Sequence, residues 1–117
     1  MISGDKQGRI WIASEAQNLF CYDLKEQSLR NYILTEHSLV STNVKCLTVD
    51  NSGTIWIGFY GDGLFYSKDN LKTLHPYLSP VDNEETYNDD VVSKIVLGAY
   101  NCLYISSLKG GVKELNL

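Results

Sequence analysis

The sequence lacks the features that would assign it to several broad classes of protein. No apolar run approaches the roughly 20 residues that a membrane-spanning helix needs, and the opening Met-Ile-Ser-Gly-Asp has neither the basic start nor the apolar stretch of a signal peptide. The net charge is −4 and the pI about 5.0, without a basic stripe, which argues against nucleic acid or an anionic membrane surface as a partner. With 44% hydrophobic residues, the 117-residue chain can instead build the core of one ordinary domain.

Signatures of catalysis and of metal binding are also missing. No G-x-S-x-G nucleophile elbow, H-E-x-x-H zinc motif or phosphate-binding loop occurs. The two histidines, His37 and His75, have no second ligand at metal spacing, so we expect no metal and no cofactor. The three cysteines, Cys21, Cys46 and Cys102, are scattered and odd in number, which predicts buried thiols and not a disulfide framework.

A turn followed by a hairpin is the best-formed local pattern. Residues 50–53, Asp-Asn-Ser-Gly, predict a tight turn, because the aspartate can accept backbone N–H groups and the glycine takes a positive φ without steric cost. Residues 54–59 are β-branched and aromatic and predict a strand. Gly61-Asp62-Gly63 then reverses the chain into a second strand, residues 64–67.

This pattern occurs three times in the chain. Trp11 precedes Trp56 by 45 residues, and Tyr104 follows it by 48 residues in the place of a third tryptophan. The positions that match in the first copy are Asp5, Gly8, Ile10, Trp11, Ile12, Asn18 and Leu19, and in the third Gly98, Asn101, Leu103, Tyr104, Ile105, Gly111 and Val112. A period in the forties, with several strands per unit, is typical of the blades of a β-propeller.

We therefore predict an all-β fold, with residues 1–117 forming a single partial β-propeller region. Its repeats are about 2–43, 44–90 and 91–117, and each is a four-stranded antiparallel meander sheet, giving about eleven strands in all. The first inner strand is expected to be short and the last outer strand to be absent. The predicted strands are 9–13, 19–24, 29–34, 44–49, 54–59, 64–67, about 73–78, 91–97, 102–106 and 112–116, with a remnant around Ile2.

Alternation along the strands predicts where the tryptophans point. Ile55 and Ile57 share one face of their strand, whereas Trp56 points to the other. Both faces are apolar, which suits a sheet packed between two neighbouring sheets. We therefore expect Trp11 and Trp56 to be core residues, and a role in stacking on a sugar is the lesser alternative.

The run V-x-x-L-x-x-D-x-x-G-x-I-W-I-G, completed by G-D-G-L, resembles the two-component regulator propeller repeat. It comprises Val44, Leu47, Asp50, Gly53, Ile55 to Gly58 and Gly61 to Leu64. The first copy departs from it at Ala13-Ser14, and the third is more divergent. The resemblance implies seven-bladed propellers in the periplasmic sensor region of a hybrid two-component receptor, as in gut Bacteroidetes, where such propellers respond to breakdown products of polysaccharides. It also implies output through a kinase, of which these residues contain no recognisable part.

Two functions from different classes are compatible with these patterns. The favoured one is a non-enzymatic sensor or interaction segment that binds an oligosaccharide with the loops at one rim of the propeller. Aromatic, carboxylate, amide and ammonium groups suited to a sugar occur in these loops at Tyr60, Asp62, Tyr87, Asn88, Asp90 and Lys109. The alternative is a propeller enzyme, a lyase or hydrolase acting on carbohydrates or lactones. Such an enzyme would need a general acid and a general base, or a set of metal ligands, brought together from different blades.

The repeat count also predicts association. Closed propellers have about four to eight blades, whereas this chain carries fewer than three complete ones. Apolar inter-blade faces and unpaired strand edges would then be open at both ends. We expect a homo-oligomer, or contact with the remaining blades and kinase module of a parent protein.

Overall fold

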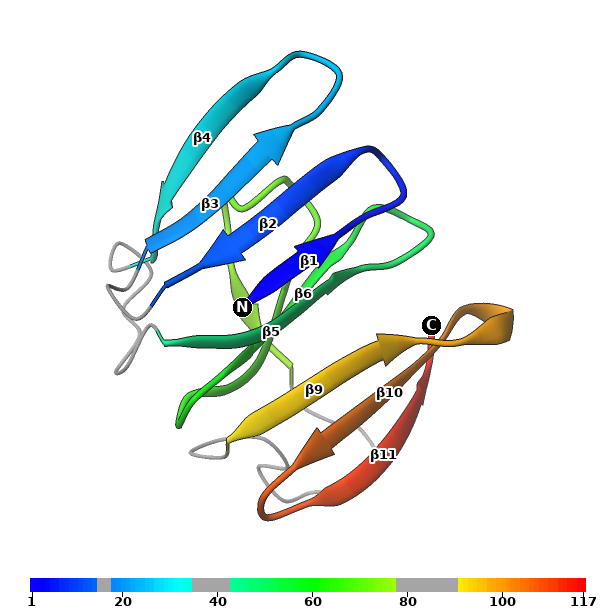
Figure 1. The fold of residues 1–117 in the computed structure, drawn as a ribbon. Helices are drawn as coiled ribbons and strands as arrows, with labels where there is room; N and C mark the ends of the chain where they lie inside the picture. Colours follow the sequence, from blue (N-terminus) through cyan, green and yellow to red (C-terminus); the bar gives the residue numbers. More distant parts are fainter. Residues whose placement is uncertain (15–17, 35–42, 78–90) are drawn as a thin grey trace.

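A computed structural model describes residues 1–14, 18–34, 43–77 and 91–117 (Figure 1). Within these residues lie eleven β-strands and the 3-10 helix η2 (Ala99–Asn101). None of the helical structure in the described part of the chain has the length and hydropathy that crossing a membrane requires. The predicted all-β class is confirmed.

The strands form three antiparallel sheets in which neighbours in the sequence are neighbours in space. The first sheet contains β1 (Ile2–Gly4), β2 (Arg9–Ala13), β3 (Asn18–Asp23) and β4 (Ser28–Ile33). The second contains β5 (Val44–Val49), β6 (Ile55–Phe59), β7 (Gly63–Ser67) and β8 (His75–Pro76). The third contains β9 (Val92–Leu97), β10 (Cys102–Ser107) and β11 (Gly111–Asn116). This is the predicted meander, with a short first strand and no fourth strand described in the third sheet.

The outer strand of the second sheet is shorter than predicted. It was expected over about 73–78, but β8 contains only His75 and Pro76, and residue 78 lies outside the described part of the chain. Two local causes limit it. Thr73 is held in a turn, since its backbone N–H donates to Asp69 Oδ1 at 2.8 Å, and Pro76 has no N–H to donate to a ladder.

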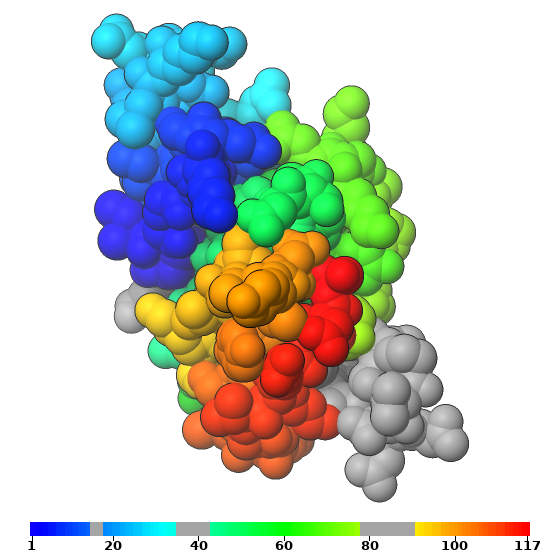
Figure 2. All heavy atoms as spheres, turned by 90° about the vertical axis from the view of Figure 1, so that its right-hand side faces the viewer, coloured from blue at the N-terminus to red at the C-terminus, as the bar shows by residue number. Residues whose placement is uncertain are grey.

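The three sheets stack face to face in chain order. The inner strand β5 lies against β1 and β2 on one side and against β9 on the other. Figure 2 shows the first sheet, in blue and cyan, and the third, in orange and red, with parts of the second, in green, between and beside them. The second sheet is therefore the only one described with a partner sheet on each face.

Strand alternation assigns each face of β6 to a different neighbour. Ile55 and Ile57 belong to a buried cluster that contains Trp11 of the first sheet. Trp56 belongs to a second cluster, with Ile95 and Leu103 of the third sheet. Trp11 is 0% and Trp56 5% exposed, so the prediction that both are core residues is confirmed. The tryptophan of one sheet thus packs on the next sheet, and the isoleucine pair packs on the preceding one.

Close approach of the second and third sheets explains a glycine of the repeat. A Cβ atom at Gly58 would lie 2.5 Å from Val92 Cγ1 and 2.6 Å from Cys46 Sγ. Atoms at such distances overlap, so any side chain at this position would push β9 away from β6. Glycine is required here by packing and not by backbone conformation.

An aspartate in the turn holds each tryptophan. Asp50 Oδ1 accepts the backbone N–H groups of Ser52 and Thr54, at 2.9 and 3.0 Å, and Oδ2 accepts Trp56 Nε1–H at 3.0 Å. Gly53 has φ +86°, as the turn predicted. In the first sheet, Asp5 Oδ2 accepts Trp11 Nε1–H at 2.9 Å in the same way.

The third repeat has lost both members of this pair together. Gly98 stands at the aspartate position and Tyr104 at the tryptophan position. The Tyr104 ring occupies the space of the missing carboxylate, because a Cβ at Gly98 would lie 2.6 Å from Tyr104 Cε2. The two substitutions are therefore sterically coupled.

The cysteines are free and buried, as predicted. Cys21, Cys46 and Cys102 are 6%, 6% and 8% exposed. Burial raises the pKa of the Cys46 thiol to about 11, so this group is neutral at physiological pH. It packs as a small apolar residue between the second and third sheets.

Truncation of Trp56 should destabilise the fold strongly. Trp56→Ala removes a buried ring and leaves Asp50 without its indole partner, for which we expect a loss of about 3–5 kcal/mol in the free energy of unfolding. The matched control is Tyr104→Ala, at the corresponding position of the third sheet, where the ring is 42% exposed. The loss in the free energy of unfolding should be much smaller for Tyr104→Ala. Urea denaturation measures both, and a loss below about 1 kcal/mol for Trp56→Ala would contradict the core assignment.

Acid should selectively weaken the turn between β7 and β8. Hydrogen bonds from the Thr73 hydroxyl and backbone N–H, with a further one from the Ser67 hydroxyl, lower the pKa of Asp69 to about 2 from 3.8. Since the folded pKa lies below the unfolded one, this carboxylate stabilises the fold fully above about pH 4, and the contribution is lost as the pH falls through 2. The stability difference between wild type and Asp69→Asn, measured by urea denaturation, should therefore shrink from about pH 6 to about pH 2.5. A difference that grows toward acid would refute the assignment.

Candidate functional site

Tyr60, Asp62 and Lys109 are the predicted ligand-binding residues that the structure describes. Tyr60 and Asp62 lie in the turn between β6 and β7, and Lys109 lies in the turn between β10 and β11. The Tyr60 ring is 52% exposed. The other predicted residues, Tyr87, Asn88 and Asp90, lie outside the described part of the chain.

Val91 brings these two turns to one rim. It forms an antiparallel bridge with Tyr60, and its carbonyl oxygen accepts the backbone N–H of Leu108 at 3.1 Å. Tyr60 N–H in turn donates to the carbonyl of Asn43, which precedes β5. Turns of the second and third sheets therefore meet where the chain enters β5 and β9.

Lys45 is a rim residue that sequence reasoning missed. Its Nζ lies 5.8 Å from the centre of the Tyr60 ring, within the range of a cation–π contact. The ladder between β5 and β6 skips a residue here, pairing Val44 with Phe59 and Cys46 with Gly58. Lys45 is the extra residue of this bulge. Regular alternation gives no signal for a bulge, so the sequence could not place its side chain.

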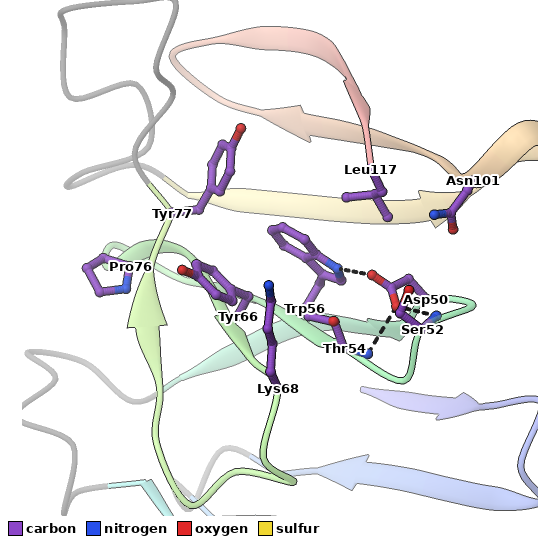
Figure 3. Close-up of a pocket in the computed structure, with 10 residues that line it drawn as sticks. All are labelled: Asp50, Ser52, Thr54, Trp56, Tyr66, Lys68, Pro76, Tyr77, Asn101 and Leu117. Atoms are coloured by element: carbon purple, nitrogen blue, oxygen red, sulfur yellow. Dashed lines mark hydrogen bonds between the residues drawn. The ribbon is translucent and has the colours of Figure 1, made fainter.

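A cavity lies at the opposite end of the same two sheets (Figure 3). It has a volume of about 670 Å³, within the range of small-molecule sites. Its lining residues are Asp50, Ser52, Thr54, Trp56, Tyr66, Lys68, Pro76, Tyr77, Asn101 and Leu117. Thr54 precedes β6 and Lys68 follows β7, whereas Tyr60 joins the other ends of these strands. The cavity and the rim of Tyr60 are therefore separate places.

Three aromatic rings form one wall of the cavity. Trp56 lies 5.4 Å from Tyr66 and 5.6 Å from Tyr77 between ring centres. In Figure 3 the Tyr77 ring stands on one side of the indole and Leu117 with Asn101 on the other. Burial raises the pKa of Tyr77, which keeps its phenol neutral. The wall offers apolar surface bordered by hydroxyl groups.

The acidic residue of the cavity is not available as a general base. Both oxygens of Asp50 already accept hydrogen bonds, Oδ1 from two backbone N–H groups and Oδ2 from the Trp56 indole. A carboxylate so engaged serves the turn, and proton abstraction from a substrate would need a free oxygen within reach. Asp50 therefore has a structural role.

Asn101 contributes an acceptor without a partner. Its Oδ1 is buried and makes no hydrogen bond in the described part of the chain. Buried amide oxygens are normally paired, so this atom marks a place where a donor fits. Asn101 occupies the position of Gly53 in the repeat and keeps a left-handed φ of +56°. The substitution places a side chain where the second repeat has none.

The cavity as a whole was not predicted, although its main residues were. Trp56 and Asp50 were assigned to the core and to a turn, and both assignments hold. The void depends on how the third sheet sits on the second, which no local pattern encodes. The described residues hold no group of three or more His, Cys, Asp or Glu side chains placed to bind a metal ion.

A family model confirms the resemblance seen in the repeat. Residues 38–61 match the model described as two component regulator propeller. The match covers the first part of the second repeat, with the turn of Asp50 and the strand of Trp56. The chain thus carries a two-component regulator propeller repeat.

Solved structures with similar folds come from several kinds of protein. The extracellular domain of a hybrid two component system from B. thetaiotaomicron is 17% identical, with a TM-score of 0.70 over 97% of this chain and 14% of that chain. Virginiamycin B lyase from Staphylococcus aureus is 19% identical, with a TM-score of 0.63 over 99% of this chain and 40% of that chain. PorZ, a surface component of the type-IX secretion system of Porphyromonas gingivalis, is 13% identical, with a TM-score of 0.52 over 98% and 25%.

These likenesses concern the fold, which is that of β-propeller blades. The chain spans 14% to 40% of the length of these three structures, so it corresponds to a part of each propeller protein. A comparison with curated proteins found no match.

Proposed function

We propose that this chain is a non-enzymatic segment of the sensor propeller of a two-component signalling receptor. The observation that carries the proposal is that residues 38–61, which lead into and include the first part of the second repeat, match the two component regulator propeller model. The likeness to the extracellular domain of a hybrid two component system is in keeping with it and favours a location outside the cytoplasm, in the periplasm. The kinase module and remaining blades of such a receptor would be its partners.

The chemistry of the described residues favours binding over catalysis. Asp50 and Asp5, the carboxylates in the turns of the second and first repeats, are engaged with their tryptophans. The Cys46 thiol is neutral and buried, which makes it a poor nucleophile. Such groups stabilise blades and leave recognition to exposed side chains at the rim.

We place the signal-binding surface at the rim of Tyr60 and infer an oligosaccharide as its ligand. An exposed aromatic ring beside an ammonium group, Lys45 Nζ, can stack on the apolar face of a sugar while the cation contacts hydroxyl groups. Asp62 and Lys109 lie in the turns that meet at this rim. Two turns from neighbouring sheets would thus contact one extended ligand.

Loss of the exposed ring should weaken sugar binding. Tyr60→Ala is expected to reduce the affinity for a bound oligosaccharide by about tenfold or more, because stacking on one aromatic ring is lost. The matched control is Tyr100→Ala, since Tyr100 is 97% exposed in η2, at the other end of the sheets. Isothermal titration with a panel of xylan, arabinan and mannan oligosaccharides provides the measurement.

The same panel separates the sensor from the enzyme alternative. Equal losses in both tyrosine variants, or no binding by wild type, would contradict the rim as the binding surface. Turnover of a saccharide or lactone by the wild-type chain would instead support a propeller enzyme and contradict the non-enzymatic proposal. Chromatography of the titrated ligand detects such turnover.

The open face of the first sheet is the basis for the proposed homo-oligomer. Register places Ile10, Tyr22 and Leu29 opposite one another on the face turned away from Trp11. Leu29 is 61% exposed, and Ile2, on the same face through its pairing with Ile12, is 73% exposed. An apolar sheet face of this kind favours association.

Association should therefore respond to charge on this face. We expect the scattering mass of the wild-type chain to rise with concentration in the micromolar range. Leu29→Lys should restore the monomer mass, whereas Leu108→Lys should not, because Leu108 is an exposed leucine in the turn between β10 and β11. A stable wild-type monomer at all concentrations would contradict the proposal.

A further inference from the structure

The first strands of the three sheets lie next to one another, each with one edge open (Figure 1). β1, β5 and β9 each stand at one end of the strand order in their own sheet, and β5 contacts both of the others. An edge strand presents backbone N–H and C=O groups that have no partner in a ladder. In the described part of the chain, three such edges therefore gather in one place.

A groove of about 270 Å³ lies along these edges. All three strands contribute to its lining, which includes Ser3 of β1, Lys45 and Thr48 of β5, and Lys94 of β9. Sites for whole small molecules have volumes of roughly 300–1,000 Å³. The groove therefore has room for one group of a larger ligand and not for an entire oligosaccharide.

The groove carries positive charge, although the net charge of the chain is −4. Lys45 and Lys94 line it, and the described lining residues include no aspartate or glutamate. Burial raises the pKa of the Cys46 thiol to about 11, and both ammonium groups act against this shift, so the fields of the two lysines reach the same buried atom. Neither lysine forms an ion pair within the described residues. Two uncompensated cations in a groove attract anions.

Packing of the sheets does not account for Lys94. A shift of 48 residues carries Cys46 to Lys94. Cys46 is 6% exposed, and its thiol donates to the Val92 carbonyl oxygen at 3.6 Å, so it fills the junction between the second and third sheets. Lys94 is exposed and has no comparable contact in the described part of the chain. The third repeat therefore has a charged residue where the second has a small buried one.

A backbone donor lies in the same groove. Asp50 N–H donates to the Thr54 carbonyl oxygen at 3.0 Å, and the hydrogen bonds of an antiparallel ladder recur at every second residue. The N–H of Leu47 consequently points away from β6, to the open edge of β5, and Leu47 lines the groove. A backbone N–H together with ammonium groups forms a donor set suited to anionic oxygen atoms.

Lys45 connects this groove to the rim of Tyr60. Its Nζ lies 5.8 Å from the centre of the Tyr60 ring, and the same residue lines the groove. The exposed ring and the positive groove are therefore neighbouring parts of one surface. A sugar unit stacked on Tyr60 would have the groups of the adjoining unit beside the groove.

We propose that the groove between β1, β5 and β9 is the subsite for an acidic group, a carboxylate or a sulfate ester, of the oligosaccharide that stacks on Tyr60. Lys45 contacts the ligand where the rim meets the groove, and Lys94 with the Leu47 N–H binds the anionic oxygen atoms. This inference rests on the proposed sensor function and narrows its ligand, because acidic oligosaccharides then bind more tightly than neutral ones.

The first test compares acidic and neutral ligands of matched structure. Isothermal titration at low salt sets trigalacturonate against its methyl ester, and sulfated maltotriose against maltotriose. The wild-type chain should bind the acidic member of at least one pair about tenfold more tightly, since each of two ammonium groups contributes a factor of a few, and salt should reduce this preference. The pair with the larger preference identifies the acidic group as carboxylate or sulfate.

The second test removes one charge from the groove. Lys94→Gln should lower the preference for the acidic ligand by about threefold and leave the affinity for its neutral counterpart unchanged. The matched control is Lys25→Gln, which removes the same charge from an exposed residue in the turn between β3 and β4 and should leave the preference unchanged. In the wild-type chain, the acidic ligand should shift the N–H resonances of Leu47 and Tyr60, and the neutral ligand that of Tyr60 alone.

Three results would overturn the inference, and they separate it from the sensor proposal. Equal affinities within both ligand pairs, with a shift at Tyr60 alone, would exclude the acidic subsite and leave sugar binding at the rim intact. Equal losses of preference in the two lysine variants would show that overall charge, and not the groove, attracts the ligand. A Tyr60 resonance unchanged by these ligands and by neutral oligosaccharides would contradict the rim itself as the binding surface, and the subsite with it.

Discussion

The central strand β6 is buried on both of its faces, and the arrangement of all three sheets depends on this constraint. Because side chains alternate along a strand, Ile55 and Ile57 must pack on one neighbour and Trp56 on the other. The same alternation in β2 turns Trp11 toward the second sheet. A single period-2 pattern therefore fixes the order of the stack, with the tryptophan face of one sheet always against the isoleucine face of the next.

The pairing of aspartate and indole links this stack to the turns. One carboxylate organises its own turn through backbone N–H groups and at the same time orients the ring that packs on the next sheet. The third repeat shows that the two residues act as a unit, since Gly98 and Tyr104 replace them together and the ring fills the space that the carboxylate leaves. Its open face carries Val96, Tyr104 and Val112 together with Lys94, Ser106 and Glu114, so apolar and charged side chains alternate there.

The two ends of the stacked sheets differ in what they present. At the rim of Tyr60, exposed polar and aromatic groups are presented by turns whose backbones are tied together through Val91. At the other end, tight turns and the buried Leu71 of the turn between β7 and β8 close one junction, and an aromatic cavity remains at the next. The strands β6 and β7 separate the rim, where we propose ligand binding, from the cavity along their length.

The sequence by itself determined the strands, their meander order and the burial of both tryptophans, because these depend on local turn chemistry and on alternation, which a single repeat unit contains. It also predicted which turns lie together at the rim of Tyr60, because the order of connections in a meander decides which turns share one end of the sheets. Tertiary structure alone decided the position of Lys45, which follows from a bulge, and the requirement for glycine at residue 58, which follows from the approach of Val92. It also decided that Trp56 lines a cavity, whereas Trp11 packs in a cluster that includes Leu71. That difference depends on whether a turn distant in sequence, such as the one carrying Leu71, lies on the ring, and residues within one repeat do not encode what packs on them from the next.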